Sequence, residues 1–199
     1  MSCQKNWVKT AERPGYVVEE RISSRGLPSI RVQCDYEFDA LTVWRAYCDP
    51  QNRKDYDPLV SEVVLTKHYG VNLYNFYQRT HKILMVAPRE FNLYMFINIE
   101  EDGSILMILF TNEDDPREPM AGTVMGGIPY GAIHITPDPK NPKRCSMNCH
   151  LEIDLSGNIP EFVTKQIVSF QCNGLVLLKK TIEPWLSRIE EKRHEPVIE

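Results

Sequence analysis

The chain has 199 residues, of which 42% are hydrophobic and 25% charged, and its formal net charge is −4. These values are typical of a single globular domain over residues 1–199 with one substantial core. They argue against a nucleic-acid partner, because no cluster of Lys and Arg is long enough to neutralise several phosphates.

Six cysteines are scattered along the chain, which is too large to need disulfides for stability. The first residues, "MSCQKNWVKT", lack the apolar segment of a secretory signal, and no apolar run reaches the roughly 18 residues that span a membrane. We therefore expect a cytoplasmic protein with reduced thiols.

The first clear element is a strand at 31–39, "RVQCDYEFD", in which apolar and polar residues alternate. Asp39 is then expected to cap a helix over 40–48. A second short helix follows, with Asp49 as its N-cap and Pro50 as its first residue, and Pro58 ends it.

From there to about residue 155 the pattern predicts strands only, followed by one long C-terminal helix after "SGNIP". Gly174 is expected to weaken this helix, and Pro184 is expected to kink or restart it. The expected strands are 62–69, 73–82, 90–99, 104–111, 123–136 and 145–155. Two connections rich in proline and charge interrupt them, 112–122 and 137–144.

This order of elements predicts an α+β fold, a curved antiparallel sheet with one long helix packed on it. Several strands look apolar on both faces, among them "LMILF" and "NLYMFINI". An internal cavity beneath the helix accounts for this excess, and a larger core without a cavity accounts for it equally well.

The segment "CSMNCHLEID" resembles a metal site, because it carries Cys145, Cys149 and His150. Its strict alternation predicts a strand, on which positions four apart are separated by ~13 Å. Two thiolates that share one zinc ion must lie within roughly 4 Å of each other, and His150 points to the opposite face. We therefore expect buried structural cysteines, no metal and no cofactor.

The sequence contains no P-loop, no dinucleotide-binding glycine motif, no G-x-S-x-G and no H-E-x-x-H. The glycine-rich "MGGIPYG" favours a strand bend over a phosphate cradle. No group of acid, base or nucleophile stands out, so we expect a protein that is not an enzyme.

Arg53 and Asp57 lie four residues apart on the second short helix. An exposed pair of this kind stabilises a helix by only ~0.3 kcal/mol. The helix dipole disfavours Asp57 at the C-terminal end, however, so a buried pairing with Arg53 explains its position better.

Three motifs occur in order along the chain: "RKDYD", "APREF" and "DLSGNIPEFV". They resemble the R-x-x-W-D, P-R-D-F/Y and D-x-x-G-x-I-P motifs of START lipid-transfer domains, and the resemblance extends from about Trp7 to about Lys192. It implies a helix-grip fold, in which the sheet wraps around the C-terminal helix and encloses a lipid cavity. It also implies that 112–122 and 137–144 are Ω-loops, the first forming part of a gate.

One site is similar to the phosphatidylcholine-transfer branch of this family. There a tyrosine, an arginine and an aspartate contact the phospholipid head group, and Tyr47, Arg53 and Asp57 have the same spacing. The resemblance implies that Arg53, held by Asp57, binds the phosphate and that Tyr47 adds a hydroxyl donor.

The sequence also departs from the family. Tyr56 replaces the motif tryptophan, and Glu90 replaces the aspartate of P-R-D. The aromatic residues that cage choline in that branch correspond in part to Gln78 and Phe91, so the cage is incomplete.

The resemblance thus implies a non-enzymatic, monomeric carrier that binds one phospholipid and contacts membranes transiently. Val163, Ile167 and Phe170 of the C-terminal helix would line the chain cavity, although ordinary helix-on-sheet packing accounts for them equally well. The alternatives are a sterol, ceramide or fatty-acid carrier on the same fold, a helix-grip enzyme, or a regulatory module that acts through a partner.

Overall fold

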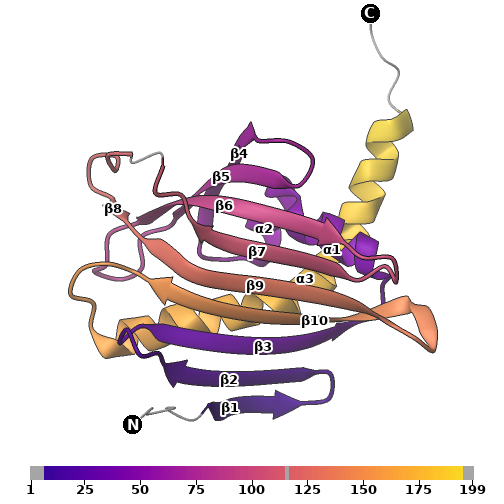
Figure 1. Cartoon of the computed structure of the whole chain (residues 1–199), viewed down its shortest axis with the longest axis horizontal. Helices are drawn as coiled ribbons and strands as arrows, with labels where there is room; N and C mark the ends of the chain where they lie inside the picture. The colour runs from indigo at the N-terminus through magenta and orange to yellow at the C-terminus, as the bar shows by residue number, and fades with distance from the viewer. Residues whose placement is uncertain (1–6, 115–116, 195–199) are drawn as a thin grey trace, which may run out of the picture.

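A computed structural model of the chain describes residues 7–114 and 117–194. In that part of the chain ten strands form one sheet, and three helices lie on its inner face, behind the sheet in Figure 1. The strands are β1 (Val8–Arg13), β2 (Tyr16–Ile22), β3 (Pro28–Tyr36), β4 (Val60–His68), β5 (Leu73–Thr80), β6 (Arg89–Ile99), β7 (Ile105–Thr111), β8 (Val124–Met125), β9 (Gly127–Asp138) and β10 (Asn141–Asp154). The helices are α1 (Ala40–Cys48), α2 (Pro50–Tyr56) and α3 (Glu161–His194).

Neighbouring strands follow the order β1-β2-β3-β10-β9-β7-β6-β5-β4, and the pairs along this path are antiparallel. The short β8 pairs in parallel with β6. Tyr36 of β3 lies opposite Cys145 of β10, so the N-terminal strands join the sheet through its last strand. The predicted α+β layout is confirmed.

The hairpin of β1 and β2 was not predicted. Every residue of β1 is exposed, so this strand carries no alternation of apolar and polar residues. The turn between the two strands contains Pro14 and Gly15, and Gly15 has a φ of +66°. This Pro-Gly pair is the local signal that marks a turn there.

Residues 137–144 do not form the Ω-loop that the resemblance implies. They form the hairpin between β9 and β10, in which Asp138 lies opposite Asn141. The Lys140 backbone N–H closes the turn by donating to Asp138 Oδ1 at 2.8 Å. The pairing is irregular between Asn141 and Cys145, which is where a strand tolerates proline.

The predicted strand 123–136 is interrupted at Gly126, which separates β8 from β9. A Cβ atom at Gly126 would lie 2.6 Å from Phe91 Cε1 and 3.0 Å from the Asp154 carbonyl oxygen. The glycine therefore allows the chain to pass close to Phe91, and the predicted bend is confirmed.

The two short helices have the predicted caps. Asp39 Oδ1 accepts from the Thr42 backbone N–H at 2.9 Å, and Asp49 Oδ1 accepts from the Gln51 and Asn52 N–H groups at 2.8 and 3.0 Å. Asp57 is the C-cap of α2. These caps fix where α2 begins and ends, and thereby where Arg53 lies.

Helix α3 is continuous across Pro184, so the helix does not restart there. Pro184 lies inside the helix, where it removes one backbone hydrogen bond, and the predicted kink stays a prediction. The Tyr36 hydroxyl donates to the Leu175 carbonyl at 2.8 Å and ties α3 to β3.

The inner side of β10 forms part of the core. Cys145, Met147, Cys149, Leu151 and Ile153 are all buried, and the intervening residues are not. The prediction of buried structural cysteines is confirmed for Cys145 and Cys149. All cysteines of the described residues are free thiols, and Cys3 lies outside those residues.

Candidate functional site

A cavity of about 330 Å³ lies between the inner face of the sheet and the three helices. Its sheet wall is aliphatic and aromatic apart from Gln78, and its helix wall carries most of the polar groups. The sheet wall consists of Val63, Leu65, Tyr74, Phe76, Gln78, Phe91, Leu93, Met95, Ile97, Met107, Leu109, Ile128, Leu151 and Ile153. The helix wall consists of Trp44, Tyr47, Cys48, Pro50, Arg53 and Gln171.

Arg53 is held in this wall by α2. Its Nη2 lies 2.9 Å from Asp57 Oδ2, and its Nη1 donates to the Tyr56 hydroxyl at 2.9 Å. The Tyr56 hydroxyl in turn donates to the Tyr47 carbonyl at 2.7 Å, which joins α2 to α1. The Arg53 and Asp57 side chains are only 15% and 4% exposed, so the predicted buried pair is confirmed.

The surroundings keep Arg53 charged. Burial acts to lower the pKa of the guanidinium, but Tyr56, Tyr47 and the Asp57 carboxylate outweigh burial, and the pKa lies well above its usual value. The Arg53 guanidinium also lies 5.1 Å from the centre of the Tyr47 ring. Asp57 Oδ1 accepts from the Leu59 N–H at 3.1 Å, so both carboxylate oxygens are in use.

Two buried donors on the helix wall have no hydrogen-bond partner within the described residues. They are Arg53 Nε and Trp44 Nε1. A buried N–H without an acceptor costs about 1–3 kcal/mol, so both groups reduce the stability of this wall.

The structure brings four predicted site residues to the cavity: Tyr47, Arg53, Gln78 and Phe91. Asp57 lies behind Arg53 and faces a smaller hollow. The predicted residues of α3 pack beside it: Val163 and Ile167 pack with Leu59 and Val86 in one cluster, against which Phe170 also packs, and Ile167 lines a small hollow shared with Phe91 and Gln171. Helix α3 contributes Gln171 to the cavity instead.

Sequence reasoning missed Trp44 and Gln171 as cavity residues. Trp44 looked like one member of an apolar helix stripe, and its spacing of three residues from Tyr47 is the signal that places both on one face. Gln171 lies among polar neighbours such as Ser169 and Asn173, so the sequence carries no comparable signal for it.

Glu90, which replaces the aspartate of the P-R-D motif, is buried and holds the loop that follows β7. It accepts from the Met120 backbone N–H at 3.0 Å and from the Thr123 hydroxyl. The expected role of 112–122 as part of a gate stays a prediction, with Glu90 as its attachment point on β6.

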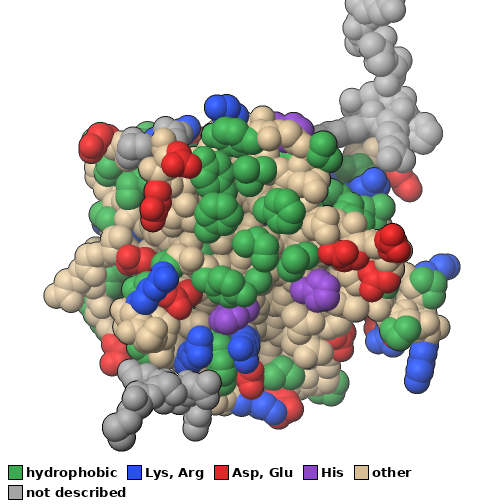
Figure 2. All heavy atoms as spheres, viewed as in Figure 1, with side chains coloured by type: hydrophobic (Ala, Val, Ile, Leu, Met, Phe, Trp, Pro, Cys, Tyr) green, Lys and Arg blue, Asp and Glu red, His purple; other side chains and the backbone are tan. Residues whose placement is uncertain are grey.

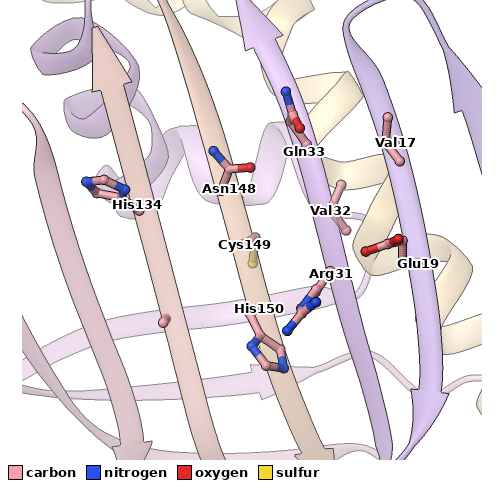
Figure 3. Close-up of a pocket in the computed structure, with 10 residues that line it drawn as sticks. Val17, Glu19, Arg31, Val32, Gln33, His134, Asn148, Cys149 and His150 are labelled. Atoms are coloured by element: carbon pink, nitrogen blue, oxygen red, sulfur yellow. The ribbon is translucent and has the colours of Figure 1, made fainter. Parts of the chain in front are cut away.

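A second hollow, of about 350 Å³, lies on the outer face of the sheet (Figure 3). Figure 2 shows this face, where His and Lys or Arg side chains lie beside a group of hydrophobic ones. Burial lowers the pKa of His150, and the positive charges of Arg31 and Arg21 lower it further. Among the described residues no group of three His, Cys, Asp or Glu could hold a metal ion.

No family model matches the chain, and a search of curated proteins found no match. Solved structures match it well. Human StAR-related lipid transfer protein 5 superposes with a TM-score of 0.76 and 22% identity, over 90% of this chain and 87% of that one. The lipid transfer and protein localization domain of human StarD13 superposes with a TM-score of 0.75 and 14% sequence identity, over 90% of each chain. The STAR-related lipid transfer protein of Xanthomonas axonopodis superposes with a TM-score of 0.73 and 18% sequence identity, over 89% of this chain and 98% of that one.

These matches establish the fold, which is the expected helix-grip fold of START domains. Within the described residues, no helix combines the length and the apolar character needed to cross a bilayer.

Proposed function

Because the chain has the START helix-grip fold, we propose that it binds one lipid in the cavity and transfers it between membranes. The observation that carries this proposal is the division of the cavity into an apolar sheet wall and a helix wall with donors. An amphiphile matches both walls at once.

The apolar wall suits hydrocarbon chains. Each CH₂ group removed from water contributes about 0.8 kcal/mol, so a chain that leaves a membrane needs a comparable apolar environment. Side chains such as Leu93, Met107 and Leu109 are buried and supply that environment.

The polar end of the lipid is assigned to Arg53. Arginine forms strong charge-assisted hydrogen bonds to phosphate, and Arg53 is the charged side chain among the described residues that line the cavity. This supports a phospholipid, with Tyr47, Gln78 and Phe91 around its head group. A sterol, ceramide or fatty acid is the second candidate. The volume of about 330 Å³ lies near the lower end of the range for small-molecule pockets, which favours the sterol and the fatty acid. A phospholipid or a ceramide has two chains and requires the walls to move apart.

A carrier is favoured over an enzyme by the residues around the cavity. The described residues that line it include no histidine and no carboxylate. Burial raises the pKa of the Cys48 thiol to about 12, so this residue stays protonated and is a poor nucleophile.

Two measurements test the proposal. Native mass spectrometry of the purified protein is expected to show one bound lipid, whose mass separates a phospholipid from a sterol, ceramide or fatty acid. Labelled phospholipid is expected to move from donor to acceptor liposomes when the protein is added. Absence of both a bound lipid and transfer contradicts the proposal.

Transient membrane contact is assigned to one end of the molecule, where large apolar side chains are exposed. Leu84 and Met85, between β5 and β6, are 58% and 74% exposed, and Phe162 in the first turn of α3 is 57% exposed. Their neighbours Ile83, Val86 and Val163 pack in one cluster, so the two exposed segments lie close together. Exposed apolar side chains of this kind bind the boundary of a bilayer.

We expect Met85→Asp to weaken binding to phosphatidylcholine–phosphatidylserine vesicles about tenfold, because a charge replaces an apolar side chain that would enter the bilayer. Vesicle co-sedimentation measures this. The matched control is Val71→Asp in the turn between β4 and β5, where Val71 is 87% exposed but lies outside this cluster. Equal losses in the two variants would contradict the assignment.

A further inference from the structure

Met120 lies in the loop between β7 and β8, and two donors of β5 surround its sulfur. Arg79 Nη1 donates to Met120 Sδ at 3.3 Å, and the Tyr77 hydroxyl lies 4.0 Å from the same atom. The Met120 side chain is 54% exposed, so solvent reaches it. We propose that Met120 is a site of reversible oxidation by a peroxide, and that Arg79 and Tyr77 bind the resulting sulfoxide. This chemistry is independent of the lipid in the cavity.

The sulfur of Met120 is a poor match for the donor beside it. A thioether is only a weak acceptor, whereas a guanidinium is a strong, charged donor. Arg79 is held from its other side as well, because its Nη2 lies 2.9 Å from Glu62 Oε2. Arg79 therefore directs a strong donor at an atom that accepts hydrogen bonds poorly, and an oxygen atom added to the sulfur would use that donor fully.

The Tyr77 hydroxyl keeps its proton at neutral pH. Burial raises the pKa of this phenol to about 12, and the negative charge of Glu90 acts in the same direction. Tyr77 can therefore also donate to an oxygen atom on the sulfur of Met120.

The reaction with hydrogen peroxide is a two-electron oxidation of the sulfur. A lone pair of Met120 Sδ attacks one peroxide oxygen, so the S–O bond forms and the O–O bond breaks. The second oxygen leaves as hydroxide and takes up the proton of the transferred oxygen through solvent, which gives water. The sulfoxide oxygen is polar, and its hydrogen bond from Arg79 is charge-assisted. Methionine sulfoxide reductases return the sulfoxide to the thioether.

The backbone of Met120 transmits the change to the loop. Its N–H donates to Glu90 Oε1 at 3.0 Å, and its carbonyl accepts from the Thr123 N–H at 3.0 Å and from the Thr123 hydroxyl at 2.7 Å. Met120 therefore attaches the loop to β6 through its backbone and to β5 through its side chain. Oxidation strengthens the attachment to β5, so the loop opens less often.

Met85 provides a comparison within the same chain. Met85 and Met120 are the exposed methionines of the described residues, at 74% and 54%. The Met85 sulfur accepts no hydrogen bond from any described residue. Peroxide should therefore oxidise both side chains, but only the sulfoxide of Met120 gains a charged donor.

The test uses Met85→Leu, which leaves Met120 as the exposed methionine of the described residues. Peptide mass spectrometry after treatment with hydrogen peroxide locates the added oxygen, and hydrogen exchange of 117–124 is measured before and after. We expect the amides of Met120 and Thr123 to exchange about 3- to 10-fold more slowly after oxidation, because opening of the loop must also break a hydrogen bond to a charged group. Methionine sulfoxide reductases should restore the original rate.

Two further variants identify the donor, each compared before and after oxidation. Met85→Leu combined with Arg79→Ala lacks the guanidinium, so oxidation of Met120 should no longer slow exchange. In Met120→Leu, oxidation of Met85 should leave exchange of 117–124 unchanged.

Three results contradict the proposal. Met120 stays unoxidised in the wild type while Met85 is oxidised, or exchange in Met85→Leu is unchanged or faster after oxidation, or the slowing persists without Arg79. None of them bears on lipid binding, so the proposed function stands in each case.

Discussion

Replacing Arg53 by alanine is expected to reduce lipid transfer to background and to lower the free energy of unfolding by about 3–5 kcal/mol. The loss of stability follows because Asp57, whose side chain is 4% exposed, is left as a buried charge without its partner. Tyr56 also loses the hydrogen bond from Arg53 Nη1. Transfer falls because the cavity loses the donor assigned to the head group. Urea denaturation and the liposome assay measure the two effects.

A double variant separates stability from lipid binding. Arg53→Met combined with Asp57→Leu removes both charges, and replacing a buried pair by apolar residues is often neutral or stabilising. We expect this protein to regain most of the lost stability and still to transfer little phospholipid. Transfer at the wild-type rate would show that Arg53 does not hold the head group.

Arg89→Ala is expected to lower the free energy of unfolding by about 3 kcal/mol or more. Arg89 is buried and donates to three carbonyls: from Nε to Leu155 at 2.8 Å, from Nη1 to Ala87 at 2.6 Å and from Nη2 to Ser156 at 3.0 Å. Each hydrogen bond from a charged group contributes about 1.5–3 kcal/mol. Two of the carbonyls belong to the segment that leads into α3, so the start of this helix loses its attachment to β6.

The matched control is Arg79→Ala, on the neighbouring strand β5. Arg79 forms an ion pair with Glu62 at 2.9 Å, with side chains 30% and 38% exposed. An exposed pair contributes at most about 1 kcal/mol. Urea denaturation should therefore separate the two variants clearly, and comparable losses would contradict the role given to Arg89.

The sequence predicts elements well where burial is one-sided. Strand β10 alternates strictly because its inner residues enter the core, and helices α1 and α2 are bounded by capping aspartates. Sequence-based prediction fails for β1, because every residue of this strand is exposed and apolar and polar residues do not alternate. It also fails at 137–144, where prolines that usually mark loops sit at the irregular end of a hairpin.

The residues of the candidate site were also predictable only in part. The pairing of Arg53 with Asp57 was predictable, because an aspartate at a helix C-terminus needs a compensating charge. The cavity residues of α3 were not, because an apolar stripe shows that a helix face is buried but not what it packs against. Val163 and Ile167 meet Leu59 and Val86, whereas Gln171 meets the cavity.

The pairing of β3 with β10 also determines when the protein can fold during its synthesis. Buried side chains of β3, such as Ile30 and Val32, lie opposite Leu151 and Cys149, which are made much later. Closing a loop of this length is slow, because its entropy is lost before the contacts form. We therefore expect the apolar side chains of β3 to stay uncovered until β10 has been synthesised. Only then can α3, the last element, dock on the completed sheet and close the cavity.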